Sequence, residues 1–138
     1  MFRKIDDRIS VFGQIRPEDV ATAAAQGFTT IVNNRPEEEE AGQPAGDTIK
    51  AAAKEAGLAY VAIPITHAGF SIPQVDAMRK AIANADGPIL AFCRSGTRST
   101  LLWALASAAD GADPEEVARK AAAAGYDVSP VRPFMAPR

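Results

Sequence analysis

Four short apolar stretches alternate along the chain with longer helix-forming segments, and this alternation restricts the fold more than any other feature. The stretches cover residues 8–13, 28–34, 59–65 and 87–93, and each is rich in β-branched, aromatic or aliphatic residues. Parallel strands need a crossover of about a dozen residues, which a helix supplies. The pattern therefore predicts a three-layer α/β fold, in which helices flank a mostly parallel sheet of four to five strands.

The length of the chain suits one domain. Its 138 residues fall within the range of about 100–150 that one hydrophobic core usually serves. Hydrophobic residues make up 47% and charged residues 23%, which excludes a disordered or fibrous chain. We expect one domain over residues 1–138, with a proline-rich, extended tail at 130–138.

Charge and hydropathy exclude several functions. The formal net charge is −2 and the basic residues are scattered, so we expect no nucleic-acid partner. No apolar segment has the length of a membrane span or a signal-peptide core, so we expect a cytoplasmic protein without membrane contact. The one cysteine, Cys93, and the one histidine, His67, cannot build a zinc cluster, and no metal or other cofactor is indicated.

The segment CRSGTRS, residues 93–99, lies between the last apolar stretch and a helix. Backbone N–H groups in such a strand-to-helix turn can converge on one centre and bind an anion. The same field favours a thiolate on Cys93, which makes it the candidate nucleophile, whereas an inert buried cysteine would not need these polar neighbours. Arg98 can place its two-pronged guanidinium on the bound anion, so we expect these two residues to carry the chemistry.

The other residues of this segment are expected to complete an anion-binding loop. Gly96 tolerates a positive φ and lets a ligand approach closely. Ser95, Thr97 and Ser99 supply hydroxyl donors, and Ser99 is expected to bond the sulfur. Arg94 is expected to point outward and raise the local potential.

The chain resembles two groups of proteins. CRSGTRS resembles the active loop of rhodanese-type sulfurtransferases, in which a cysteine and an arginine close a six-residue ring around a persulfide. It also resembles the phosphate loop of cysteine-dependent phosphatases, but it has one residue fewer between the cysteine and the arginine. The segments GQIRPEDVATAAAQGFTTIVNNRPEEEE and YVAIPI are similar to dual-specificity phosphatase-like domains and, more closely, to the bacterial phosphatase-like domains of β-lactamase hydrolase-like proteins. This resemblance, over residues 8–128, implies a cysteine-phosphatase-like sheet.

The reaction expected at Cys93 depends on a proton donor. Phosphate ester cleavage usually needs an acid beside the nucleophile to protonate the leaving oxygen. The segment THAGFS, residues 66–71, contains no acid, while Asp76 falls inside the next helix and Asp86 precedes the last strand. Sulfur transfer has no such requirement. We therefore expect a sulfane sulfur to move from thiosulfate or a low-molecular-weight persulfide, through a Cys93 persulfide, to a thiol acceptor.

Two alternatives remain open at this stage. One is a protein-tyrosine or dual-specificity-phosphatase-like hydrolase that acts through a phosphocysteine at Cys93. The other is a non-catalytic module that only binds oxyanions. The expected substrate is a small molecule or a thiol. A persulfide-oxidising metallo-β-lactamase-like enzyme is a further expected partner, because relatives of the family occur beside enzymes of that kind.

Two further residues form a candidate substrate rim. His67 lies on the segment predicted to border the thiol and could orient the substrate or act as a weak acid or base, but the sequence favours an exposed loop histidine without a role. Arg35 follows the second apolar stretch and could attract an anion, or it could pair with the acidic run Glu37 to Glu40. That run is expected to be a solvated loop.

Overall fold

The computed structural model describes all 138 residues and contains one five-stranded sheet. The strand order is β1-β2-β5-β3-β4, in which β2, β5, β3 and β4 run parallel and β1 pairs antiparallel with β2 at one edge. The strands are β1 (Arg3–Lys4), β2 (Ile9–Phe12), β3 (Thr30–Asn33), β4 (Ala59–Ala62) and β5 (Ile89–Phe92). The predicted α/β sheet is confirmed, and β1 is the strand that the sequence pattern did not indicate.

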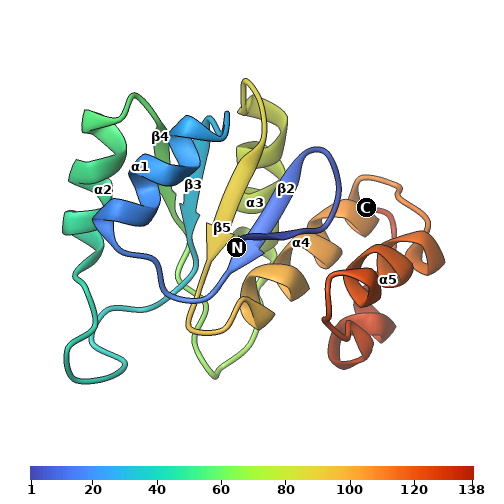
Figure 1. Cartoon of the computed structure of the whole chain (residues 1–138). Coiled ribbons are helices and arrows are strands. Elements are labelled where there is room, and N and C mark those ends of the chain that lie inside the picture. Colours follow the sequence, from blue (N-terminus) through green and yellow to red (C-terminus); the bar gives the residue numbers. More distant parts are fainter.

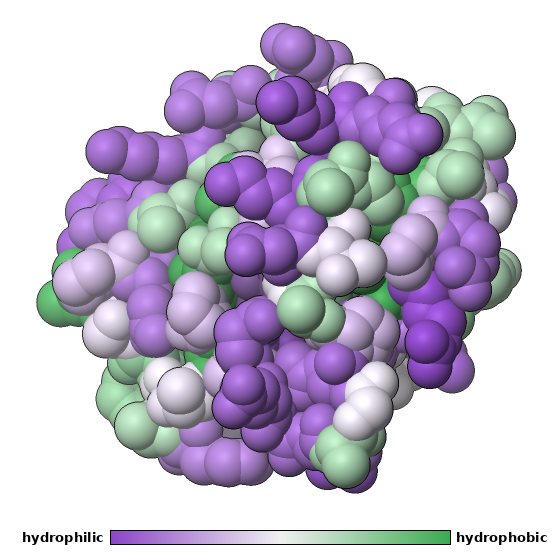
Figure 2. Space-filling view, turned by 90° about the vertical axis from the view of Figure 1, so that its left-hand side faces the viewer, coloured by the Kyte–Doolittle hydropathy of each residue, from purple (hydrophilic) through white to green (hydrophobic).

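Helices cover both faces of this sheet (Figure 1). One face is covered by α1 and α2, which share a core cluster with β3 and β5, and the other by α3 and α4, with α5 packed against α4. The helices are α1 (Pro17–Ala25), α2 (Gly46–Glu55), α3 (Ile72–Asn84), α4 (Thr97–Ala109) and α5 (Pro114–Ala123). None of them is both long and apolar enough to cross a bilayer. On the side formed by α2, hydrophilic side chains are interspersed with small apolar ones (Figure 2).

Strand β5 lies at the centre of the sheet, and its side chains alternate between the two cores. Ile89 and Ala91 belong to the cluster with α3 and α4, whereas Leu90 and Phe92 belong to the cluster with α1 and α2. All four are at most 1% exposed. This explains the uninterrupted apolar run in the sequence, because a strand covered on both faces has no solvent-facing position. The buried strand also fixes the position of the residue that follows it, Cys93.

The C-terminal segment differs from the expected extended tail. Residues Ser129–Phe134 form a 3-10 helix, η1, and Pro130 stands in its first turn, where the fixed φ of proline is compatible with a helix. Val131 and Met135 are buried against α4 and its neighbours. The burial of these two apolar side chains stabilises the segment on the domain, which the proline content alone did not indicate.

Candidate active site

Cys93 directly follows β5, at the end of the sheet where the four parallel strands have their carboxyl ends. The loops that leave β2, β3, β4 and β5 all gather at this end of the sheet, which is the lower one in Figure 1. The thiol is free and its residue is fully buried. Carboxyl ends of parallel strands are where open α/β sheets bind ligands. Cys93 therefore lies at the carboxyl ends of the parallel strands, as its position after the last apolar stretch predicts.

The backbone of the Cys93 loop, residues 93–98, donates one hydrogen bond to the sulfur. The Gly96 N–H donates to Cys93 Sγ at 3.1 Å, and Gly96 has φ +92, a left-handed conformation that favours glycine. Gly96 is also the N-cap of the 13-residue helix α4. The N–H groups of Arg94, Ser95 and Arg98 donate to no other group of the protein. A helix N-terminus with unused amides beside a sulfur is a site for an anion.

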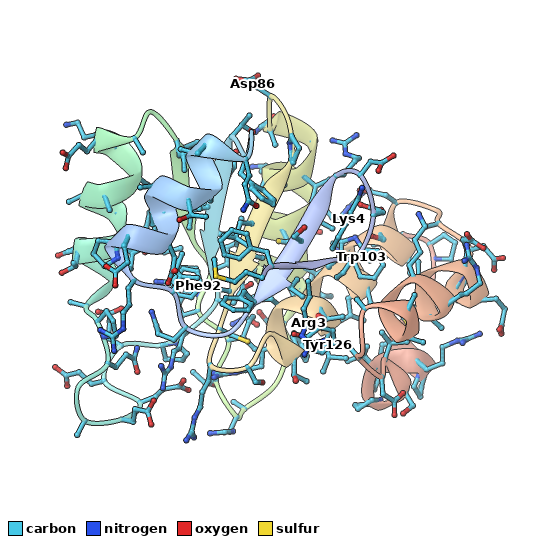
Figure 3. All side chains as sticks on the ribbon, viewed as in Figure 1. Arg3, Lys4, Asp86, Phe92, Trp103 and Tyr126 are labelled. Carbon is cyan, nitrogen blue, oxygen red and sulfur yellow. The ribbon has the colours of Figure 1, made fainter.

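Tyr126 holds the same loop from outside. Its hydroxyl donates to the Ser95 carbonyl at 3.0 Å, and the Ser95–Gly96 peptide bears that carbonyl on one side and the N–H that reaches the sulfur on the other. Because a peptide is planar, fixing its carbonyl also fixes the direction of its N–H. Arg3 lies 5.9 Å from the centre of the Tyr126 ring, and the two are neighbours in Figure 3. No local pattern indicates Tyr126, because only the packing of α5 brings it to the loop.

Arg98 lies beside the sulfur but is held mainly by other groups. Its Nη1 donates to Glu39 Oε2 and to the Ile65 carbonyl, both at 2.7 Å, and its Nη2 donates to Glu39 Oε1 at 2.8 Å. The hydrogen bonds with Glu39 raise the pKa of Arg98, and the neighbouring Cys93 contributes to the same shift. These contacts use three of the five guanidinium donors, so Nε–H and one Nη2–H are available to an anion.

Arg35 and the acidic run form an ion-pair network instead of a substrate rim. The Arg35 side chain is only 1% exposed and donates to Glu39 at 2.9 Å, to Gln14 at 3.1 Å and to Glu40 at 3.1 Å. Of the two interpretations of Arg35, the pairing with the acidic run is the one that the structure contains. Because the guanidinium is buried among these partners, it is not available as an anion-attracting group at the surface.

Glu39 is the centre of this network, and the expectation of a purely solvated acidic loop is wrong for it. Its side chain is 16% exposed and bridges Arg98 and Arg35. The hydrogen bonds from Arg98, followed by those from Arg35, lower the pKa of Glu39 to about 2. Glu37 is likewise engaged, since its carboxylate accepts the N–H of Gly46 at the start of α2 at 2.8 Å. Like charges adjacent in sequence thus have different structural roles.

The hydroxyl groups of the segment do not converge on the sulfur as expected. Ser99 is buried, but its hydroxyl donates to Asn34 Oδ1 at 2.7 Å, and Asn34 in turn donates to the Ile63 carbonyl at 2.9 Å. Ser99 therefore ties α4 to the loop after β3, and its predicted bond to the sulfur is wrong. The hydroxyls of Ser95 and Thr97 bond each other at 3.1 Å on the exposed side of the loop.

Arg94 is exposed, as predicted, with its Nη2 3.5 Å from Glu40 Oε2. His67 is exposed on the loop after β4 and has no hydrogen-bond partner. Neither residue is fixed toward the sulfur by a contact in the structure.

A carboxylic acid suited to protonating a leaving group is not found beside Cys93. Asp86 lies at the opposite end of the sheet (Figure 3), and Asp76 binds Arg79 and Arg138. Glu39 is near, but its lowered pKa keeps it ionised at neutral pH, so it does not carry a proton to donate. No three His, Cys, Asp or Glu side chains gather as a metal site would require.

Comparisons with known proteins point to one family. Residues 1–110 match the family described as Beta-lactamase hydrolase-like protein, phosphatase-like domain. A Beta-lactamase hydrolase-like protein of Xylella fastidiosa is 36% identical over 125 residues, which cover 90% of this chain and 29% of that protein. The chain thus spans less than a third of the length of that relative. The same description applies to a relative from Agrobacterium fabrum, 38% identical over 108 residues, covering 78% and 25% of the two chains.

A solved structure with a high overall similarity is a candidate phosphatase from Neisseria meningitidis. It is 34% identical, superposes with a TM-score of 0.82, and the match covers 96% of this chain and 94% of that one. Other solved structures with lower identity share the fold alone. The expected cysteine-phosphatase-like fold is confirmed.

The expectation of sulfur transfer is wrong. The matching family and the similar Neisseria structure are both described as phosphatase-like, and neither is described as a sulfurtransferase. The physical reason for the error is that both reactions use a cysteine in an amide-lined anion loop, so the loop alone does not distinguish them. The missing acid is therefore not enough to favour sulfur transfer over phosphate hydrolysis.

Proposed function

The chain belongs to the phosphatase-like domain family of beta-lactamase hydrolase-like proteins, and we propose that it hydrolyses phosphate monoesters through a phosphocysteine on Cys93. The observation that carries this proposal is the Cys93 loop itself. A buried sulfur accepts the Gly96 N–H at 3.1 Å, and three neighbouring N–H groups and two donors of Arg98 are unused. This set of donors matches the oxygens of a phosphoryl group that is being transferred.

The reaction has two steps. The Cys93 thiolate attacks phosphorus, a sulfur–phosphorus bond forms, and the bond from phosphorus to the leaving oxygen breaks, so that the leaving group departs with the electron pair as an alkoxide or phenoxide. Water then attacks the phosphocysteine, releases inorganic phosphate and regenerates the thiolate. The loop amides and Arg98 hold the non-bridging oxygens in both steps.

The absence of a carboxylic acid near the sulfur affects the choice of substrate. A leaving oxygen that receives no proton departs as an anion, so the reaction favours esters whose leaving group is stable as an anion. Aryl phosphates meet this condition better than simple alkyl phosphates. We therefore expect measurable turnover with p-nitrophenyl phosphate.

The test compares the wild-type protein with two variants. Cys93→Ser should abolish p-nitrophenyl phosphate hydrolysis, and Arg98→Lys should lower kcat by about 10²-fold or more, because lysine lacks the forked donor set. Rapid quenching followed by intact-mass measurement should show one added phosphoryl group on the wild-type protein and none on Cys93→Ser. Sulfate binding without turnover or phosphoryl adduct would refute hydrolysis and leave an anion-binding module.

A further inference from the structure

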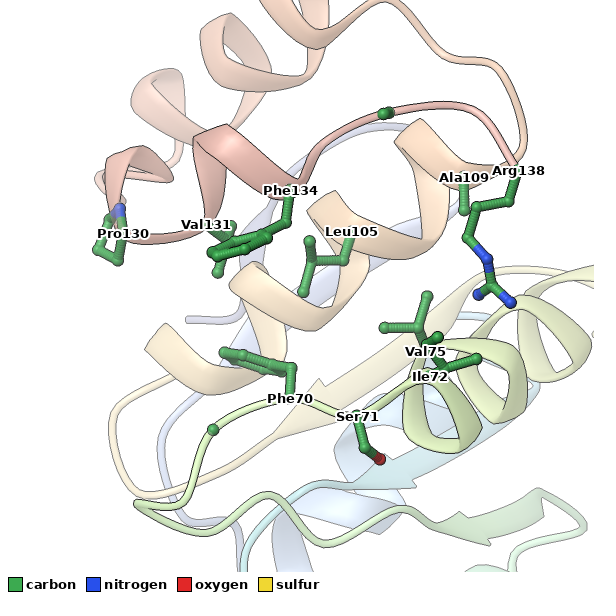
Figure 4. Close-up of a pocket in the computed structure, with 12 residues that line it drawn as sticks. Phe70, Ser71, Ile72, Val75, Leu105, Ala109, Pro130, Val131, Phe134 and Arg138 are labelled. Carbon is green, nitrogen blue, oxygen red and sulfur yellow. The ribbon is translucent and has the colours of Figure 1, made fainter.

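A cavity with mainly apolar walls lies outside the Cys93 loop, between α3, α4 and η1. It measures about 460 Å³ and is lined by 12 residues, eight of them hydrophobic. Small-molecule sites usually occupy about 300–1,000 Å³ and have mainly apolar walls. Figure 4 shows Phe70 and Val75 on one side, Leu105 of α4 as the floor, and Phe134 of η1 opposite. We name this cavity the α4 groove.

The α4 groove and the Cys93 loop are linked through α4. Leu105 and Ala109 line the groove, and Arg98 lies seven residues before Leu105, two helical turns away on the same face. Two turns of helix correspond to about 10 Å. The loop after β4 connects them a second time, because the Ile65 carbonyl accepts a hydrogen bond from Arg98 and Phe70 of the same loop lines the groove. The groove and the Cys93 loop therefore lie on the same side of α4, about two helical turns apart.

The polar groups of the groove are already paired. The Ser71 hydroxyl accepts the N–H of Gln74 as the cap of α3. The Arg138 guanidinium binds both carboxylate oxygens of Asp76, which closes the far end of the groove with an ion pair. Since no polar side chain is left to recognise a head group, the groove suits an apolar chain.

The rim of the groove leaves apolar surface in contact with water. Ile72 is 62% exposed and Phe134 is 73% exposed, and they are two of the three large hydrophobic residues that the protein exposes. The Cys93 loop offers hydrogen-bond donors to an anion, whereas the groove, about two helical turns further along α4, has mainly apolar walls. This polarity is complementary to an amphiphile with a phosphate head and one hydrocarbon tail.

We propose that the α4 groove binds the hydrocarbon tail of an amphiphilic phosphate monoester whose phosphoryl group occupies the Cys93 loop. The proposal rests on the proposed function and specifies its substrate class. A tail that spans about 10 Å before it reaches Leu105 must be long. Short esters would then be held by the loop alone, whereas long ones gain affinity by removing apolar surface from water.

The test measures the binding of alkylphosphonates, whose phosphorus–carbon bond the enzyme does not hydrolyse. Ethyl, butyl, octyl and dodecyl phosphonate are titrated into the wild-type protein by calorimetry, each below the concentration at which it forms micelles. Affinity should be similar for ethyl and butyl phosphonate. It should rise by about threefold for each methylene that enters the groove, giving at least about a tenfold difference between octyl and dodecyl phosphonate.

Variants separate the groove from the anion loop. Ile72→Ser with Phe134→Ser removes two exposed rim side chains and should weaken dodecyl phosphonate without changing ethyl phosphonate. Ala136→Trp places bulk in the groove and should have the same effect. Ala21→Trp, on the exposed side of α1, adds the same bulk elsewhere and should leave the chain-length dependence intact.

The outcomes distinguish this proposal from the proposed function. Equal affinity for all four phosphonates, with p-nitrophenyl phosphate still hydrolysed, refutes the groove and leaves the phosphatase. A chain-length dependence that Ala136→Trp removes, without any turnover, supports the groove and refutes hydrolysis. If Phe134→Ser converts a dimer to a monomer in sedimentation and the wild-type affinities are independent of chain length, the surface pairs two copies of the chain and the proposal is wrong.

Discussion

Replacing Glu39 by glutamine should destabilise the protein in a way that depends on pH. The carboxylate accepts hydrogen bonds from Arg98 at 2.7 and 2.8 Å and from Arg35 at 2.9 Å, and its pKa is lowered from 4.5 to about 2. At 1.36 kcal/mol per pH unit this difference corresponds to about 3 kcal/mol. Partial exposure of the side chain screens the interaction, so we expect Glu39→Gln to lose about 2 kcal/mol of unfolding free energy at pH 7.

The sign of the pH dependence follows from the lowered pKa. Between pH 4.5 and pH 2 the unfolded chain binds a proton at Glu39 more readily than the folded chain does. The stabilisation is therefore complete above about pH 4.5 and is lost as the pH falls toward 2. At pH 3 about two-fifths of it should remain, so the difference between wild type and variant should shrink to below about 1 kcal/mol.

Urea unfolding measures this difference, because Trp103 is the single tryptophan and only 4% exposed, so its fluorescence reports on the fold. Glu38→Gln is the matched control, since Glu38 is adjacent, exposed and forms no ion pair. Its unfolding free energy at pH 7 should equal that of the wild type. A Glu39→Gln loss that is the same at pH 7 and pH 3, or that is absent at pH 7, would refute the ion-pair argument.

Three further substitutions test the packing around the Cys93 loop. Tyr126→Phe removes the hydroxyl bonded to Ser95 and should cost about 1 kcal/mol of stability, while kcat for p-nitrophenyl phosphate falls and KM changes little; an unchanged kcat contradicts the role of Tyr126. Gly96→Ala introduces a side chain at φ +92 and a Cβ 2.2 Å from the Tyr126 hydroxyl oxygen, so urea unfolding should show a loss of at least about 1–2 kcal/mol, part of which Tyr126→Phe should restore. Asn34→Leu leaves the buried Ser99 hydroxyl without its acceptor and should cost about 1–3 kcal/mol, whereas the double variant with Ser99→Ala should be more stable than Asn34→Leu alone.

The sheet could be predicted because its determinants are local. Each parallel strand is a short run of apolar residues next to glycine or proline, and Ser71 with Gln74 forms the capping box that the spacing indicates. Strand β1 has two residues, both exposed, so it carries no hydrophobic pattern and was missed. The helix of the C-terminal segment is unpredictable for a different reason, because it depends on the burial of Val131 and Met135 by distant elements.

Only the residues of the candidate site that are close together in the sequence can be predicted from it. Cys93, Gly96 and Arg98 share one short loop, and their geometry follows from the turn between a strand and a helix. Glu39 contacts Arg98 of this loop from 59 residues away in the sequence. Tyr126 contacts Ser95 because α5 packs beside the loop. One acidic residue among four consecutive ones offers no local signal for which of them will pair. The position of Ser99 after the loop suggests a bond to the sulfur, but its hydroxyl binds Asn34 in the loop that follows β3, which local sequence does not indicate.

The hydrogen bond between Tyr126 and Ser95 makes the geometry of the Cys93 loop depend on the last quarter of the polypeptide. Segments that pack on the outside of a domain tend to open at lower free energy than the central strands do. When α5 detaches, the peptide before Gly96 is released while β5 and its neighbours are still folded. Mild denaturant or heat should therefore inactivate the protein before its central strands unfold, so that loss of turnover is a more sensitive measure of damage than loss of secondary structure.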